Sequence, residues 1–135
     1  MNLKASIVLS LTAGLSPLIA IAAEPMSGGE FERYVNGKTL YFGLAGQAYG
    51  AEEYLPNRQV RWSFLDGECK QGHWYEDAGS ICFVYEDKPE PQCWSFFKEG
   101  EKLRAVFEND PGSTVLYEAQ QNEEPMMCLG PDVGV

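Results

Sequence analysis

The sequence predicts an all-β domain, a small antiparallel meander barrel of about eight strands with one short N-terminal helix. Apolar and polar side chains alternate with a period of two through most of residues 38 to 118, as in strands that bury one face. Glycine, proline, asparagine and aspartate interrupt this alternation at intervals of roughly eight to twelve residues. Such short connections favour sequential antiparallel neighbours, and closure into a barrel removes exposed edges. A two-sheet β-sandwich is the alternative.

The start of the chain predicts export. Lys4 is followed by residues 5–21, which are almost wholly apolar or small, and residues 20–22 form the small-x-small pattern that a signal peptidase reads. The apolar run is short for a bilayer span, which disfavours an uncleaved anchor. We therefore expect residues 1–23 to be a signal peptide and residues 24–135 to form one periplasmic or secreted domain, with no membrane span after cleavage.

The mature chain is strongly acidic. Removal of the leader leaves nine Lys and Arg against twenty Asp and Glu, a formal charge of −11, because Lys4 is lost from a chain of charge −10. Such a field repels nucleic acid and anionic lipid headgroups, so we expect neither as a partner. It favours encounters with cationic proteins, although solubility is a simpler reason for the charge.

A short helix is predicted just after the leader. Ser27 followed three residues later by Glu30 is typical of a capping box, and Phe31 and Tyr34 fall on one helical face. Asn36 with Gly37 provides the residues on which helices end. About two turns cannot stand alone, so we expect this helix to lay its aromatic face on an open end of the sheet.

Hairpin positions predict which side chains share the core. We place one hairpin centre between Asp77 and Ala78 and the next between Asp87 and Lys88. The expected strands cover residues 39–44, 47–54, 59–65, 69–76, 80–85, 92–98, 102–108 and 114–119. The expected core comprises Val60, Trp62, Phe64, Trp74, Ile81, Phe83, Trp94, Phe96, Leu103, Ala105 and Phe107.

Four cysteines in an exported chain of this size predict two disulfides. The hairpin registers set Cys82 directly opposite Cys93 on the outer face, with His73 beside Cys82. Cys69 and Cys128 would then form the second bridge and tie the C-terminal segment to the sheet. A slip of one residue in either hairpin would favour another pairing. The spacings contain no C-x-x-C knuckle, so we expect no metal.

No pattern of residues predicts catalysis. His73 is the only histidine, and neither a second histidine nor a serine nucleophile motif accompanies it. Glu52-Glu53 and Glu76-Asp77 are adjacent pairs, which a strand sends to opposite faces, and we interpret them as solvated turn acids. We therefore expect a protein that is not an enzyme, with no catalytic residue and no cofactor.

The aromatic content is more suggestive. Seventeen Phe, Trp and Tyr residues exceed what a small core needs, and in a barrel some could line a cavity or form a stacking surface. Aromatic residues are also good strand formers, which is the simpler reason for their number. The candidate binding residues are Tyr41, Tyr49, Tyr54, Trp62 and His73.

Several short motifs together resemble a known group of proteins. They are Asp66-Gly67-x-Cys69-x-x-Gly72-x-Trp74, Ile81-Cys82-Phe83-x-Tyr85-Glu86 and Cys93-Trp94. The pattern resembles small, uncharacterised exported proteins of Gram-negative bacteria, which implies a periplasmic β-rich domain without catalytic residues. By size, charge and compartment the chain is loosely similar to periplasmic lysozyme inhibitors, small disulfide-bonded barrels that bind a cationic enzyme. Their Ser-Gly-x-x-Tyr loop is only echoed here, at residues 45–49.

Two functions follow as hypotheses. The first is a periplasmic interaction module that engages a cationic protein through an acidic, aromatic-bearing surface. The alternative is a carrier that holds a small apolar ligand inside the barrel, and it requires a cavity among Tyr41, Tyr49 and Trp62.

Overall fold

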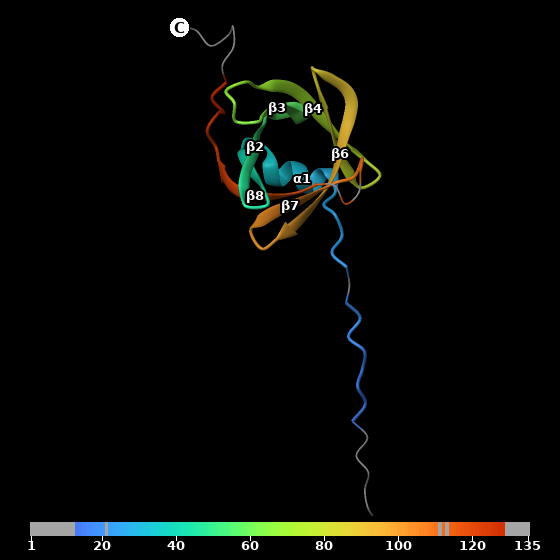
Figure 1. Cartoon of the computed structure of the whole chain (residues 1–135). Coiled ribbons are helices and arrows are strands. Elements are labelled where there is room, and N and C mark those ends of the chain that lie inside the picture. The colour runs from blue at the N-terminus through green and yellow to red at the C-terminus, as the bar shows by residue number, and fades with distance from the viewer. Residues whose placement is uncertain (1–12, 21, 111, 113, 129–135) are drawn as a thin grey trace, which may run out of the picture.

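The chain folds into a closed antiparallel β-barrel with one short helix. A computed structural model describes residues 13–20, 22–110, 112 and 114–128. Each strand pairs with the next, and the last pairs with the first (Figure 1). The strands are β1 (Thr39–Leu44), β2 (Gln47–Tyr54), β3 (Gln59–Ser63), β4 (Lys70–Asp77), β5 (Ser80–Tyr85), β6 (Lys88–Glu99), β7 (Lys102–Phe107) and β8 (Val115–Asn122). The prediction of an eight-stranded barrel is confirmed, and the sandwich alternative is wrong.

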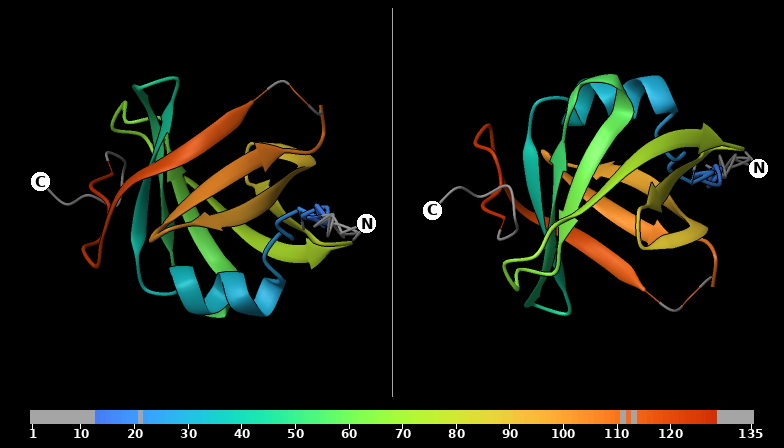
Figure 2. Two further views of the ribbon diagram at one scale, coloured as in Figure 1. Left: turned by 90° about the horizontal axis from the view of Figure 1, so that it is seen from below. Right: turned by 90° about the horizontal axis from the view of Figure 1, so that it is seen from above.

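The helix α1 (Gly28–Val35) covers one end of the barrel, as Figure 2 shows from two sides. The predicted capping box is present: the Ser27 side chain accepts a hydrogen bond from the Glu30 backbone, and the Glu30 carboxylate accepts one from the Ser27 backbone. The Phe31 side chain is fully buried. Its ring centroid lies 4.4 to 6.4 Å from those of Tyr54, Trp74, Phe83 and Phe96. We call this end of the barrel, with its five packed rings, the closed end.

The interior follows the period-two alternation of the sequence, because every second residue of each strand points inward. The buried apolar cluster is Phe31, Val35, Leu40, Phe42, Tyr54, Val60, Trp74, Ile81, Phe83, Phe96, Leu103, Ala105 and Leu116. Most of the predicted core lies in or against this cluster. Phe64 and Phe107 are the exceptions. The Phe64 side chain is 48% exposed, because β3 ends at Ser63 and leaves the ring beyond the strand, and Phe107 is only half-buried, at the end of β7.

The first predicted hairpin centre is wrong by one residue. Asp77 pairs with Ser80, so the turn is Ala78-Gly79, and both turn residues have positive φ values, 49° and 81°. Trp74 therefore lies opposite Phe83 and not Ile81. The predicted faces survive, because moving the turn centre by one residue shifts every cross-strand partner by two positions.

The same shift separates His73 from Cys82. His73 pairs with Val84, whereas Tyr75 lies opposite Cys82. The second predicted hairpin centre, between Asp87 and Lys88, is also wrong by one residue, because Tyr85 pairs with Lys88 and the turn is Glu86-Asp87. Cys82 nevertheless lies opposite Cys93, as predicted, and β6 begins at Lys88 rather than near residue 92. A register shift between Phe83 and Tyr85 absorbs the two prolines of β6, which cannot donate ladder hydrogen bonds.

Both predicted disulfides are present, Cys82–Cys93 and Cys69–Cys128. After β8 the chain crosses the outside of β1 and β2 toward the loop that holds Cys69. On the way the Thr39 hydroxyl donates a hydrogen bond of 2.8 Å to the Glu124 carbonyl. The Met126 amide donates one of 2.9 Å to the Glu53 carboxylate. Residues 124–128 are thereby held against the outer face of the barrel.

Residues 13–20 and 22–25 lie outside the barrel, are exposed and form no helix or strand. Residues 1–12, 21 and 129–135, which include most of the expected leader, lie outside the described residues. Within the described part of the chain, no helix is both long enough and apolar enough to cross a membrane. The signal peptide and its cleavage remain predictions.

Candidate functional site

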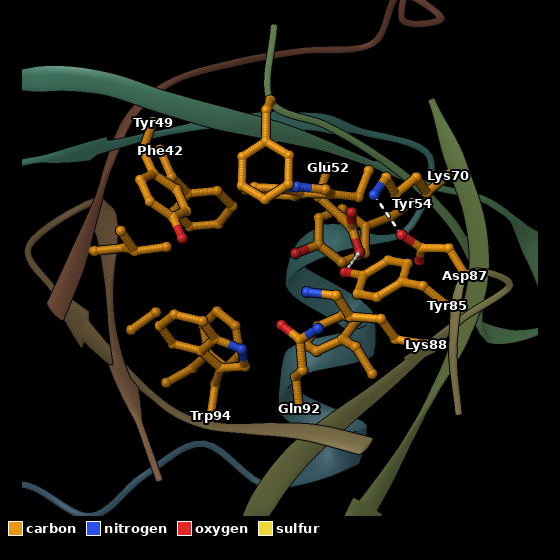
Figure 3. A pocket seen from close by; sticks show the side chains of 16 residues that line it. Phe42, Tyr49, Glu52, Tyr54, Lys70, Tyr85, Asp87, Lys88, Gln92 and Trp94 are labelled. Atoms are coloured by element: carbon orange, nitrogen blue, oxygen red, sulfur yellow. Dashed lines mark hydrogen bonds and ion pairs between the residues drawn. The ribbon is translucent and has the colours of Figure 1, made fainter. Parts of the chain in front are cut away.

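A cavity of about 150 Å³ lies inside the barrel at the end opposite α1 (Figure 3). We call this the open end; the loops at 44–47, 63–70, 85–88 and 107–115 surround it. The cavity is lined by Phe42, Tyr49, Glu52, Tyr54, Trp62, Phe64, Lys70, Phe83, Tyr85, Asp87, Lys88, Gln92, Trp94, Phe96, Ala105 and Leu116. Its wall is therefore mostly aromatic, with a few polar groups.

Two glycines shape the walls of the cavity. A Cβ atom at Gly50 would lie 2.2 Å from the Trp62 ring, and one at Gly72 would lie 2.8 Å from the Tyr85 ring. Both distances are far below van der Waals contact, so only glycine lets these two rings lie flat against neighbouring backbone. Trp62 and Tyr85 consequently lie along the wall of the cavity.

Glu52 is the most unusual residue in the wall. It points inward because it alternates with Ala51 and Glu53 on β2, and it is only 2% exposed. The Tyr85 hydroxyl donates a hydrogen bond of 2.8 Å to Oε1, whereas Oε2 has no hydrogen-bond partner among the described residues. Burial raises the pKa of the Glu52 carboxyl well above its usual range, and the Tyr85 hydrogen bond offsets this only partly.

The two tyrosines beside Glu52 stay protonated. Burial and the neighbouring Glu52 carboxyl both raise the pKa of Tyr54 and of Tyr85. Part of the Tyr85 ring is exposed at the mouth, but its hydroxyl lies at the buried end of the side chain, next to Glu52 (Figure 3). Both hydroxyls therefore keep their proton, and Tyr85 donates its proton to Oε1 of Glu52.

Charged side chains stand at the mouth of the cavity. Lys70 from β4 pairs with Asp87 from the β5–β6 turn, and the two side chains are about one-third exposed, at 34% and 35%. The hydrogen bond between them raises the pKa of Lys70 and lowers that of Asp87. Lys88 also lines the mouth but is exposed, so water screens its charge. Glu52 has no salt-bridge partner among the described residues.

Aromatic rings form the two sides of the mouth. Tyr49, Trp62 and Phe64 pack together with centroid separations of 5.4 to 6.0 Å. Trp94 lies on the opposite wall in Figure 3, and its ring centroid is 4.8 Å from that of Phe107. The rings contact one another by edges and tilted faces, so several faces turn toward the cavity or the solvent.

The structure brings together only part of the predicted binding set. Tyr49, Tyr54 and Trp62 line the cavity. Tyr41 lies on the outer face of β1, because the buried Leu40 and Phe42 on either side of it point inward. His73 is exposed on β4 and lies outside the cavity.

The interpretation of Glu52-Glu53 as solvated turn acids is wrong. Both are buried on β2, Glu52 inside the barrel and Glu53 outside it. The Glu53 carboxylate accepts hydrogen bonds from Arg61 at 2.5 Å and from the Met126 amide beneath the C-terminal segment. The strand parity of residues 47–54, already assigned from the sequence, was the signal that one of the two acids must face inward.

No protein-family model, no curated protein and no solved structure matches this chain. The resemblances to small exported proteins and to lysozyme inhibitors therefore stay predictions. Within the described residues, no three or more His, Cys, Asp or Glu side chains gather as a metal ion would require. The chemistry that the cavity offers is enclosure by aromatic rings together with one half-satisfied buried carboxyl.

Proposed function

We propose that this protein is a periplasmic, non-enzymatic binding protein that holds a small, largely apolar molecule in the open end of its barrel. The observation that carries the proposal is the aromatic-lined cavity of about 150 Å³ opposite α1. Of the two hypotheses from the sequence, this is the alternative, the ligand carrier. Tyr49 and Trp62 contribute to the cavity as that hypothesis required, whereas Tyr41 does not.

The size and lining of the cavity support a ligand with about one ring or a short chain. An apolar protein cavity of about 150 Å³ is large enough to bind benzene. Binding sites for small molecules are typically concave, mostly apolar and marked by a few placed polar groups, which is the composition found here. The rings of Phe42, Phe83 and Phe96 lie in the wall, so a ligand would lose water contact on several sides.

The arrangement of polar groups favours binding over catalysis. Glu52 interacts with a tyrosine hydroxyl and not with a histidine or a second carboxylate. The only histidine of the chain, His73, is exposed on the outer face of β4. A nucleophile with an adjacent base, the usual requirement for covalent catalysis, is not assembled around the cavity by the residues that line it.

The test is a titration of the folded domain with single-ring compounds such as toluene and phenol, followed by ¹H–¹⁵N NMR. We expect saturable shifts concentrated at residues that line the cavity, including the indole groups of Trp62 and Trp94. The variant Gln92→Trp places a large ring at the cavity and should weaken binding at least about tenfold. His73→Trp adds the same ring on the outer face and should leave binding unchanged. Shifts scattered over the surface, or equal binding by both variants, would contradict the proposal.

One feature favours the cationic protein partner as a second candidate. The loop between β3 and β4 exposes Phe64 and Leu65, 48% and 46% accessible, directly before the acidic residues Asp66 and Glu68. An aromatic anchor surrounded by acids suits a basic partner. Titration with a basic lysozyme at low and high salt tests this candidate. Affinity that does not fall as salt rises, or that survives in the double variant Phe64→Ala, Asp66→Asn, would count against it.

A further inference from the structure

Glu52 gives the cavity a chemical preference that its apolar walls alone would not have. An ionised carboxylate in a protein interior needs donors for both oxygens, and a neutral carboxylic acid needs an acceptor for its proton. Tyr85 serves Oε1, and no described residue serves Oε2. One hydrogen-bonding position of a buried acid is thus left open at the wall of a cavity large enough for a ligand.

We propose that the cavity binds a small organic cation, a primary amine or related ammonium compound carrying an apolar group of about one ring, with its ammonium paired to Glu52. This inference rests on the proposed function, because it names the class of ligand for the same cavity. Burial raises the pKa of the Glu52 carboxyl, so binding of the ammonium would release the carboxyl proton to solvent. The ammonium would then donate to the ionised carboxylate at Oε2, and the apolar group would lie among the aromatic rings of the wall.

The aromatic walls distinguish a cation from an anion. The faces of aromatic rings carry negative electrostatic potential, so they attract an ammonium within about 6 Å and repel a carboxylate or phosphate. Tyr49, Trp62, Phe64, Tyr85 and Trp94 all line the cavity. An ammonium between these rings and Glu52 would be stabilised from several directions, whereas an anion would meet Glu52 and the ring faces unfavourably.

The lysines at the mouth do not reverse this preference. Lys70 is already paired with Asp87, so this pair adds little net field to the cavity. Lys88 extends over the cavity in Figure 3, but it is exposed, so water screens its charge, and its flexible side chain can turn outward when a cation binds. The chain as a whole carries a charge of −10, which raises the local concentration of cations and speeds their approach.

A neutral ligand is the main competitor. A hydroxyl or carbonyl group could complete the hydrogen bonding of Glu52 without any charge. Hydrogen bonds between two ionised groups are roughly twice as strong as neutral ones, and only the cation also gains from the ring faces. Comparison of a cation with its neutral isostere therefore separates the two possibilities.

The experiment compares benzylamine with benzyl alcohol at neutral pH, each titrated into the folded domain and followed by NMR. We expect benzylamine to bind about tenfold or more tightly, and both compounds to shift the signals of the residues that line the cavity. In Glu52→Gln, which keeps the size of the side chain, the ratio of the two affinities should fall to within about threefold, mainly through weaker binding of benzylamine.

Glu118→Gln is the matched control. Glu118 is also a buried acid that points into the barrel, but it is absent from the cavity wall, and its two oxygens accept hydrogen bonds from Tyr34 and Gln121. This variant should keep the preference for benzylamine. If Glu52→Gln fails to give a folded spectrum, the two compounds are compared on the unaltered chain at low and high salt. A preference that comes from the acidic surface is then screened out, whereas one that comes from the buried Glu52 persists.

Equal binding of the two compounds, or tighter binding of benzyl alcohol, would overturn the proposal that the ligand is an amine. The proposed binding of an apolar molecule would then still stand. Failure of toluene, phenol and both benzyl compounds to bind would remove the proposed function together with this inference. A preference for benzylamine that persists in Glu52→Gln would also overturn it, because the acidic surface would then be the source of the preference.

Discussion

The two ends of the barrel differ in how their interior is filled. At the closed end, α1 inserts Phe31 among four other rings, and the Phe31 side chain is fully buried. Glu118, the inward-facing acid associated with α1, has both oxygens satisfied, by Tyr34 at 2.7 Å and Gln121 at 3.1 Å. At the open end, aromatic rings are just as numerous, yet a cavity remains and Glu52 keeps one oxygen without a partner.

This difference indicates that the open end is not simply an unfinished core. Filling it would require only one more apolar side chain, in the way that Phe31 fills the other end. Instead, because Gly50 and Gly72 have no Cβ atom, the rings of Trp62 and Tyr85 can lie against the backbone at these positions. A buried, half-satisfied acid costs stability and is a common mark of a functional site. Variants at the two ends should therefore separate stability from binding.

The largest expected effect comes from the closed end. Phe31→Ala removes a fully buried ring that contacts four others, so we expect the free energy of unfolding to fall by about 5 kcal/mol, the upper end for such truncations. Urea unfolding of the wild type and the variant measures this loss. A loss below about 2 kcal/mol would show that α1 covers the barrel without stabilising it, and that the two ends differ less than their packing indicates.

A smaller, pH-dependent effect is expected at Glu52. Burial raises the pKa of this carboxyl in the folded state above the value of about 4.3 that glutamate has in an unfolded chain. Between these two pKa values the folded state holds a proton that the unfolded state has released. The stability contributed by protonated Glu52 is therefore fully present below pH ~4.3 and is lost as the pH rises toward the raised pKa.

The measurement is the free energy of unfolding of wild type and Glu52→Gln across this pH range. Relative to the variant, the wild type should lose up to about 1.4 kcal/mol per pH unit, the value for one proton. The phenol groups of Tyr54 and Tyr85 stay protonated in the window because their pKa values are raised, and Lys70 stays charged because its pKa is raised as well. Parallel curves for the two proteins would mean that Glu52 is ionised in the folded state.

Local chemistry made much of the fold predictable. The capping box at Ser27 and Glu30 gives the start of α1. The pairing of Cys82 with Cys93 was predicted correctly, although in the structure it depends on the register shift between Phe83 and Tyr85 as well as on the turn. The position of the first turn did not follow, because Ala78 adopts a positive φ that alanine rarely takes, whereas Asp77 is the more usual turn residue. Because this error moved each cross-strand partner by two positions, every side chain of β4 and β5 stayed on its predicted face of the sheet.

The cavity was less predictable than the strands. Three of the five candidate binding residues, Tyr49, Tyr54 and Trp62, line it, but the hypothesis that aromatic residues exceed the needs of the core does not say which ones face inward. The interpretation of Glu52 and Glu53 together as solvated turn acids agrees with the rarity of fully buried acids in general but not with the position of Glu52 here. Alternation along β2 indicates instead that either Glu52 or Glu53 must point into the barrel. Which of the two does so is decided only by the closure of all eight strands, which sets the enclosed face of β2.

The smallest effect on stability should accompany a clear effect on binding. Phe64 lies beyond the end of β3, 48% exposed, and contacts Tyr49 and Trp62 at the mouth of the cavity. Phe64→Ala should change the free energy of unfolding by no more than about 0.5 kcal/mol, as for most surface substitutions. It should nevertheless weaken toluene binding about three- to tenfold, because the ligand loses one wall of its site. Urea unfolding and NMR titration of Phe64→Ala and Phe31→Ala test whether the two rings have separate roles. We expect Phe31 to stabilise the fold and Phe64 to contribute mainly to ligand binding. A Phe64→Ala protein that is strongly destabilised, or that binds toluene as well as the wild type, would place both rings in a single core.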